Sequence, residues 1–501
     1  MEFVPVTAFW ALVVAALRGD GRGLVYLLFS ALSFGSFAVI PPNLTGGLTF
    51  TPAPMVALIL SARLLLTPTG LQFVYQTAFD LRRLLLLTLF WIVAALVTLF
   101  APRLFAGQVE VIEMRSTILL LGSVHLKPTT QNLSQLAYLT ISIVTVFAFA
   151  CALRRPGWWI AILQGLMLGG AVAIITGLMD MAGQASPLGA ALAPFRTASY
   201  ALLTDVEVLG AKRVVGLMPE ASAYGGLCIT FLSALHFLGR LIPNAVLRDT
   251  VRPLLVLGLI AMAALSTSSA SYVAMGAFAG VAGLEWAWRL VTASSKSTDL
   301  KRLWREGVFV FTAAMALAVA VFSDPHIINP ALKMVDQMVF QKTTTSSFHE
   351  RSMWTAVSWR ALWETYGFGV GMGGTRASNS FVAVASNTGV IGATFFYGFL
   401  AWLFVRPLPT AVGVAHQMMV AARWAFLPGF TVGLLAGTSA NFSYVPALYF
   451  AILATASLET SRLNGAARRR LVVKQLERPT SRSQRPENMR SRETDSGQQI
   501  Q

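Results

Sequence analysis

Long apolar runs recur along the whole chain and constrain its fold more than any other feature. Of its 501 residues, 55% are hydrophobic and 12% are charged, whereas soluble domains carry about 25% charged residues. A membrane-spanning helix needs about 20 mostly apolar residues. By that rule about thirteen candidate spans lie near 3–17, 24–41, 52–67, 84–101, 134–153, 158–179, 214–238, 253–267, 270–287, 307–323, 379–404, 417–437 and 442–458. The candidates 253–267 and 270–287 are nearly continuous and count as one span or as two. We therefore expect an all-α polytopic membrane protein with 12 or 13 transmembrane helices.

The distribution of basic residues predicts how these spans are oriented. Alternate short loops are rich in arginine and lysine, as around Arg82 and Arg154, and such loops face the cytoplasm. The loops between them are long or uncharged, as at 180–213 and 324–378. This alternation places the C-terminus inside and, with thirteen spans, the N-terminus outside. Because long loops between packed elements tend to carry function, the long outward segment 324–378 is a candidate functional region.

The end of the chain differs from the rest in composition. A basic run from Arg462 to Arg492 contributes to the formal net charge of +16, and the last residues are polar and rich in proline and serine. We therefore divide the chain into a membrane domain, 1–458, and a basic, disordered cytoplasmic tail, 459–501. A basic run can bind nucleic acid, but one that follows a span on the cytoplasmic side fits anionic membrane lipid. We expect no nucleic-acid partner.

The segment "GFGVGMGGTRASNS" begins with a match to G-x-G-x-x-G. A dinucleotide-binding loop needs a strand before it and an acidic residue about 20 residues beyond it. Here an amphipathic helix precedes the glycines and no acid follows before Leu400, which excludes that fold. Instead, Arg376, Ser378 and Asn379 stand at the outer start of a span. Helix N–H groups and Arg376 would form an anion site at lipid headgroup level; the alternative is an ordinary helix start.

A second candidate site lies at "GAKRVVGLMPEASAYGG", where Arg213 is followed seven residues later by Glu220. If both belong to one helix, they share a face and Glu220 lies roughly two turns (about 10 Å) into the membrane. Pro219 would kink that helix beside Glu220. An ionisable residue inside a span is by default a functional candidate, although a purely structural arginine–glutamate pair is the alternative.

A third candidate site is "SFHERSMW", at the start of the amphipathic helix that precedes the glycines. His349 can act as a general base near neutral pH, or it can simply be solvated. Arg351 follows it, and the tryptophans of this helix suit a membrane interface. None of the five histidines has the spacing of a metal site, so we expect no metal and no cofactor.

Together these segments resemble the O-antigen ligase/polymerase superfamily, whose members join lipid-linked glycans on the periplasmic face of bacterial membranes. The resemblance covers roughly 205–400. Its motifs are Arg213 with Gly216 and "PEAS", the turn "STSSAS", Arg351 with Trp354 and Trp363, Gly369 with Gly371, and "SNTGVIG". Their order, spacing and membrane side make the combination more specific than any single motif.

The resemblance implies a GT-C-like membrane glycosyltransferase of the bacterial inner membrane, with one long periplasmic loop and a metal-independent reaction. Its donor and acceptor would be glycans on undecaprenyl diphosphate, and a chain-length regulator is a further candidate partner. Arg213, Arg351 and Arg376 would bind the leaving diphosphate together with Ser378 and Asn379, since cations stabilise that charge.

One departure from the family pattern bears on the reaction. Ligases that attach O-antigen to lipid A core carry a histidine before the final helix of the motif, where this chain has Ser378. This favours a polymerase of exopolysaccharide or O-antigen and leaves Glu220 and His349 as the candidate bases. A ligase with a lipid A core or protein acceptor, and a non-enzymatic flippase or transporter of lipid-linked glycans, remain the alternatives.

Overall fold

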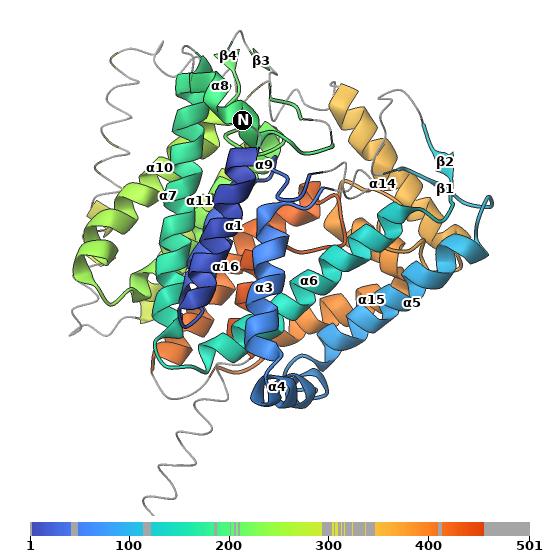
Figure 1. The fold of residues 1–501 in the computed structure, drawn as a ribbon, viewed down its shortest axis with the longest axis horizontal. Coiled ribbons are helices and arrows are strands. Elements are labelled where there is room, and N and C mark those ends of the chain that lie inside the picture. The colour runs from blue at the N-terminus through green and yellow to red at the C-terminus, as the bar shows by residue number, and fades with distance from the viewer. Residues whose placement is uncertain are drawn as a thin grey trace, which may run out of the picture. The chain divides into compact units, whose positions relative to one another are not determined.

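A computed structural model describes most of the chain (Figure 1). The described residues are 3–41, 49–113, 122–184, 188–200, 202–204, 207–208, 211–292, 346–408 and 413–454, with a few residues between 303 and 336. They belong to one compact unit, Met1–Ser457. The predicted tail, most of the predicted span 307–323 and most of the first half of the segment 324–378 lie outside the described residues.

Helices dominate the described part of the chain, as the apolar runs predict. They are α1 (Phe3–Arg18), α2 (Arg22–Ala31), α3 (Pro52–Leu65), α4 (Pro68–Ala78), α5 (Leu85–Leu104), α6 (Thr130–Leu153), α7 (Trp158–Gln184), α8 (Leu188–Leu192), α9 (Ala221–Phe237), α10 (Arg252–Leu265), α11 (Ser269–Thr292), α14 (Ser346–Glu364), α15 (Ser380–Val405) and α16 (Val414–Ala436). A last helix spans Tyr444–Ala454. The protein is therefore an α-helical, multi-pass membrane protein.

Fewer of these helices are long enough to cross a membrane than the sequence predicts. Among the described residues, six are long and apolar enough, namely α5, α6, α7, α9 with its extension to Leu241, α15 and α16. A seventh is counted if α3 and α4, which meet at a bend of 101°, form one broken span. The predicted span 24–41 is wrong in its second half, because α2 ends at Ala31 and the serine- and glycine-containing stretch beyond it packs as irregular chain.

Two short antiparallel hairpins were not predicted. In the first, β1 (Glu110–Val111) pairs with β2 (Val124–His125) between α5 and α6. In the second, β3 (Glu207–Val208) pairs with β4 (Ala211–Lys212) ahead of α9. In Figure 1 the first hairpin lies beside α14 and the second lies near α8. The second hairpin belongs to the segment 180–213, which was predicted to face outward.

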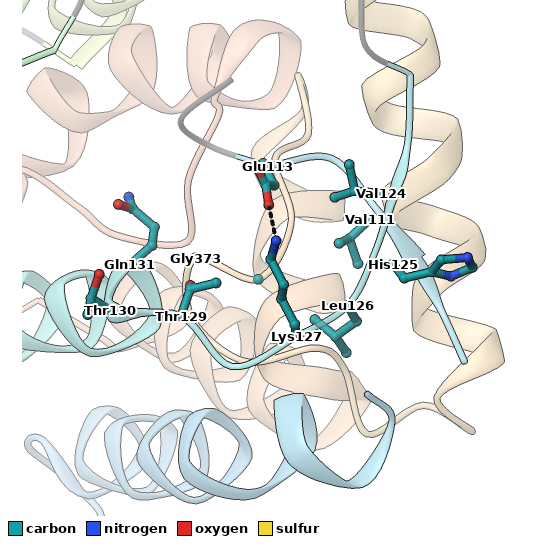
Figure 2. Close-up of a pocket in the computed structure, with 11 residues that line it drawn as sticks. Val111, Glu113, Val124, His125, Leu126, Lys127, Thr129, Thr130, Gln131 and Gly373 are labelled. Carbon is teal, nitrogen blue, oxygen red and sulfur yellow. Dashed lines mark ion pairs between the residues drawn. The ribbon is translucent and has the colours of Figure 1, made fainter. Parts of the chain in front are cut away.

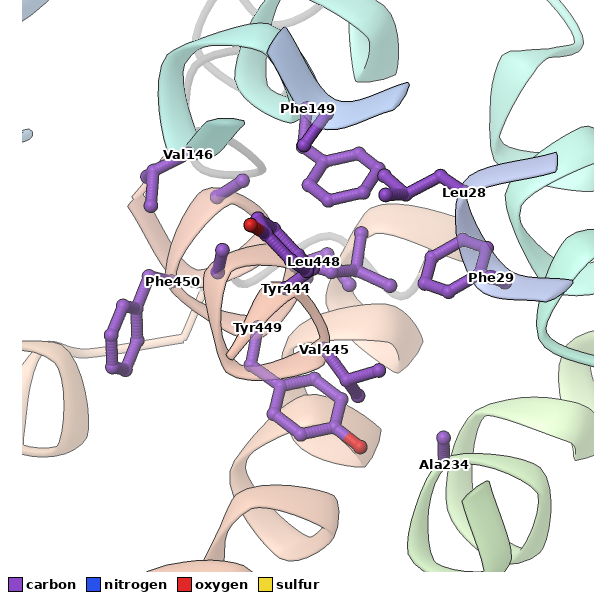
Figure 3. Packing of buried hydrophobic residues seen from close by; sticks show 14 of the residues in the cluster. Leu28, Phe29, Val146, Phe149, Ala234, Tyr444, Val445, Leu448, Tyr449 and Phe450 are labelled. Atoms are coloured by element: carbon purple, nitrogen blue, oxygen red, sulfur yellow. The ribbon is translucent and has the colours of Figure 1, made fainter. Parts of the chain in front are cut away.

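The last helix lies in the middle of the apolar core (Figure 3). Apolar residues occupy nearly every position from Tyr444 to Ala454, and most are fully buried. A helix that is apolar on all sides is stable only when other helices surround it. Around it pack side chains of α2 and α6, whose Phe29 and Phe149 rings stack with centroids 5.9 Å apart. This core holds the helices whose ends carry the candidate site.

Candidate functional site

The glycine-rich turn packs against the protein's own backbone. Gly369 and Gly389 both have positive φ, at +82° and +74°, a conformation that side chains rarely adopt. A Cβ on Gly369 would lie 2.6 Å from the backbone nitrogen of Gly389, so only glycine permits this approach. Gly389 interrupts α15 with non-helical torsion angles, and the turn fills that interruption.

The N–H groups of this turn are largely occupied. Four of them donate within the protein. The N–H groups of Gly369 and Met372 donate to the hydroxyls of Thr365 (3.0 Å) and Thr98 (2.9 Å). Those of Val370 and Gly374 donate to the carbonyls of Ser386 (2.8 Å) and Gly371 (2.9 Å). The backbone of this turn therefore lies against α15 and α5. The glycines shape the site without supplying a phosphate cradle.

The start of α15 is capped by its own residue. Asn379 is the N-cap, and its side-chain oxygen accepts from the N–H groups of Phe381 (2.9 Å) and Val382 (3.1 Å). The expectation that these N–H groups are free for an anion is wrong. Ser378 is buried, with 8% exposed, and its N–H donates to Thr355 Oγ1 at 3.1 Å. Both residues thus hold the segment that carries Arg376.

Arg376 is fixed by contacts with α14. Its guanidinium carbon lies 3.7 Å from the ring centroid of Trp354, which is a cation–π contact. Its carbonyl accepts from Ser358 Oγ at 2.9 Å, and Ser358 is fully buried. Because Trp354 and Ser358 belong to the same helix as Arg351, these contacts set Arg376 in place relative to Arg351. Thr355 and Ser358 were not predicted as site residues, because small hydroxyl residues in an amphipathic helix form no motif that marks a binding site.

Arg213 lies in an irregular segment before α9. The prediction that it shares a helix face with Glu220 is wrong, because α9 begins only at Ala221 and Glu220 is its N-cap residue. Glu220 therefore stands at the end of the span, not two turns inside it. Pro219 also precedes the helix, so it does not kink it. The Arg213 Nε–H donates to the Ser266 carbonyl at 3.3 Å, which joins this segment to the turn "STSSAS".

A buried ion pair holds the segment that carries Arg213 and Glu220. Asp180, near the end of α7, is 2% exposed and contacts Arg196 at 2.8 Å. Its other carboxylate oxygen accepts from the N–H groups of Val215 (2.8 Å) and Gly216 (3.1 Å). Arg196 in turn donates to the Gly216 carbonyl at 3.2 Å. The predicted span 158–179 ends one residue before Asp180, whereas α7 continues to Gln184 and includes it.

Charges from three distant segments meet at this site. Burial lowers the pKa of Arg213. The charge of Arg351 lowers this pKa further, whereas Glu220 and Tyr272 raise it. Burial also lowers the pKa of Arg376, and here too Arg351 lowers the pKa, whereas the Glu220 and Glu350 carboxylates raise it. Glu220 and Arg351 are thus close enough to act on both arginines. The structure brings Arg213, Arg351, Arg376 and Glu220 together.

His349 is less closely connected to this group. It lies on the first turn of α14, is exposed, and its ring makes an edge contact with Phe348 at a centroid distance of 6.1 Å. Among the described residues, no contact joins it to Arg213, Arg376 or Glu220. Of the two candidate bases, Glu220 is the one placed among the arginines.

Comparison with known proteins gives no independent assignment. No protein-family model matches the chain, and no curated protein is similar to it. The function is therefore inferred from the residues that meet at this site.

Proposed function

We propose that this protein polymerises undecaprenyl-diphosphate-linked oligosaccharide repeat units into exopolysaccharide or O-antigen, on the periplasmic face of the bacterial inner membrane. The observation that carries the proposal is the meeting of Arg213, Arg351 and Arg376 with Glu220, whose charge acts on both Arg213 and Arg376. Even with Glu350, which also acts on Arg376, three cations and two carboxylates leave a net positive charge at the end of membrane-spanning helices. That position suits the diphosphate of a lipid whose tail stays in the membrane.

The chemistry of glycosyl transfer fits these groups. An acceptor hydroxyl oxygen forms a bond with the anomeric carbon of the donor glycan, and the bond from that carbon to the diphosphate oxygen breaks. The lipid diphosphate leaves with the bonding electrons, and arginines stabilise the charge that develops on it. The hydroxyl proton passes to a base, for which Glu220 is the better placed candidate. Arginine side chains supply the positive charge, so the proposed reaction is metal-independent.

The partly buried environment strengthens the proposed role of the arginines. Burial lowers the pKa of both Arg213 and Arg376, which reports that their charged forms are partly desolvated. A desolvated guanidinium interacts more strongly with an anion than a solvated one does. An arginine also remains charged despite such a shift, because its usual pKa lies far above neutral pH. Binding a diphosphate would offset the like-charge repulsion among the three guanidinium groups.

A deletion strain tests the proposal in cells. If the protein is the polymerase, deletion should remove long polysaccharide chains and leave single repeat units, on their carrier or attached as one unit. Gel electrophoresis and mass spectrometry of the extracted glycans distinguish these products. Long polymer that accumulates on the lipid carrier would identify a ligase instead, and repeat units trapped on the cytoplasmic side would identify a flippase.

A further inference from the structure

A cavity of about 200 Å³ opens beside the arginine site, between the β1–β2 hairpin, the first turn of α6 and the glycine-rich turn. Its lining residues are Val111, Glu113, Val124, His125, Leu126, Lys127, Thr129, Thr130, Gln131, Gly373 and Gly374. Gly373 and Gly374 belong to the glycine-rich turn, and the other lining residues lie outside the arginine site described above. Figure 2 shows the side chains around it.

Polar groups stand on two sides of this cavity. On one side Lys127 Nζ lies 3.6 Å from Glu113 Oε1, and both side chains are well exposed. At that distance the two charges attract, but the contact is longer than a hydrogen bond. On the other side lie Thr130 and Gln131, whose side chains take no hydrogen bond within the described part of the chain. Figure 2 shows both on the first turn of α6, and His125 pointing away from them.

The remaining wall is apolar. Val124 lines the cavity, is partly exposed, and packs against the buried Val111 and Leu126. A Cβ on Gly373, whose φ is +70°, would lie 2.7 Å from Gln135 Cγ, so this position requires glycine where the turn packs against α6. An apolar side chain with hydrogen-bonding groups around it matches a sugar ring, which has apolar C–H faces and hydroxyl groups around its edge.

The cavity and the arginine site share a wall. The N–H of Arg376 donates to the carbonyl of Ile112 at 3.0 Å, and the N–H of Ile112 donates to Thr375 Oγ1 at 3.2 Å. Ile112 lies between two lining residues, and Thr375 follows Gly374. A single stretch of chain, 373–376, thus leads from the cavity to the guanidinium of Arg376. A glycan that reacts at the arginines would extend past this cavity.

We propose that the cavity is a subsite for one uncharged pyranose ring of the glycan. The Glu113 carboxylate accepts from two neighbouring hydroxyl groups, Lys127 and the Gln131 amide donate to ring substituents, and Val124 packs against the ring face. An acidic sugar is disfavoured because its carboxylate would lie beside that of Glu113. The assignment to the glycan rests on the proposed function, whereas binding of a sugar by the cavity does not.

Ligand-observed NMR tests this subsite without any lipid-linked donor. The probes are the methyl glycosides of glucose, galactose and N-acetylglucosamine, offered to the full-length protein in detergent. We expect at least one to show saturation transfer from the wild type, and Glu113→Gln or Gln131→Ala to weaken its binding roughly tenfold, since each removes one strong hydrogen-bonding partner.

The matched control is Glu110→Gln. Glu110 lies on the same hairpin, but its carboxylate accepts from Ser123 Oγ at 2.7 Å and does not line the cavity. This variant should bind the glycosides as the wild type does. If no glycoside binds, or if Glu113→Gln and Glu110→Gln bind equally well, the cavity is not a sugar subsite. Sugar binding in a protein that makes no polymer would leave the subsite intact and reject only the polymerase.

Discussion

Replacing Arg213 or Arg351 with alanine should abolish long-chain polysaccharide in a complemented deletion strain while the amount of membrane-inserted protein stays near normal. Each guanidinium is proposed to hold the leaving diphosphate, and loss of one such group costs about 100-fold or more in rate. Both side chains are only partly buried, so their removal leaves no cavity in the apolar core. Polymer length on gels and protein amount on immunoblots measure the two effects separately.

Conservative variants and a control on the same helix sharpen this experiment. Arg213→Lys and Arg351→Lys should restore part of the polymer, because lysine keeps the charge but loses the planar, two-pronged geometry of arginine. Arg360→Ala is the matched control, since Arg360 lies on α14 with Arg351 but is exposed. Wild-type polymer from both alanine variants at Arg213 and Arg351 would reject the diphosphate site.

The second large effect is expected at Asp180. Asp180→Ala removes the acceptor of two backbone N–H groups and leaves Arg196 without its carboxylate. Breaking a buried ion pair by removing one partner costs about 3–5 kcal/mol, so the purified protein should unfold at a clearly lower temperature. Because this carboxylate holds Val215 and Gly216, polymer formation should fall as well. Thermal unfolding in detergent and polymer length in cells provide the two measurements.

The control for Asp180 is an ion pair of similar geometry at the surface. Asp20 contacts Arg22 at 2.9 Å, with both side chains largely exposed, and such pairs contribute little to stability. Asp20→Asn should therefore unfold at the wild-type temperature. Asp180→Asn retains one acceptor oxygen and should fall between the wild type and the alanine variant. An Asp180→Ala protein as stable and active as the wild type would show that the pair does not position the site.

The sequence predicted those parts of the fold that depend on runs of one residue class. Apolar stretches gave α5, α6, α7, α15 and α16 within a few residues, because burial in lipid or in a helical core requires such stretches. The amphipathic pattern before the glycines likewise predicted α14. The sequence did not predict the backbone conformation at the helix ends.

The errors at Glu220 and at the start of α15 have one physical cause. Seven residues separate Arg213 from Glu220, and helical geometry places such a pair on one face, but the segment turns at Gly216, whose φ is +55°. The anion site was expected because helix N–H groups at the start of a span are free in an uncapped helix, but here Asn379 accepts from two of them. In both places the outcome depends on the backbone conformation at a helix end, which neither periodicity nor spacing encodes.

The pairing of Asp180 with Arg196 illustrates the same limit in a different form. Asp180 lies one residue beyond the predicted span 158–179, and its partner Arg196 lies among several polar residues of the segment predicted as a loop. Only the fold of the 213–220 segment shows that the second oxygen of Asp180 accepts from two backbone N–H groups. The positioning role of Asp180 therefore follows from three-dimensional contacts alone.

Purified protein supplied with a single lipid-linked repeat unit, and with no other acceptor and no added metal, gives the most direct test of the proposed reaction. A polymerase must use one such molecule as donor and a second as acceptor. We predict a ladder of products that differ by one repeat unit, with release of one lipid diphosphate for each bond formed, and no ladder from Arg351→Ala. Products that appear only after lipid A core or a protein acceptor is supplied would contradict the account.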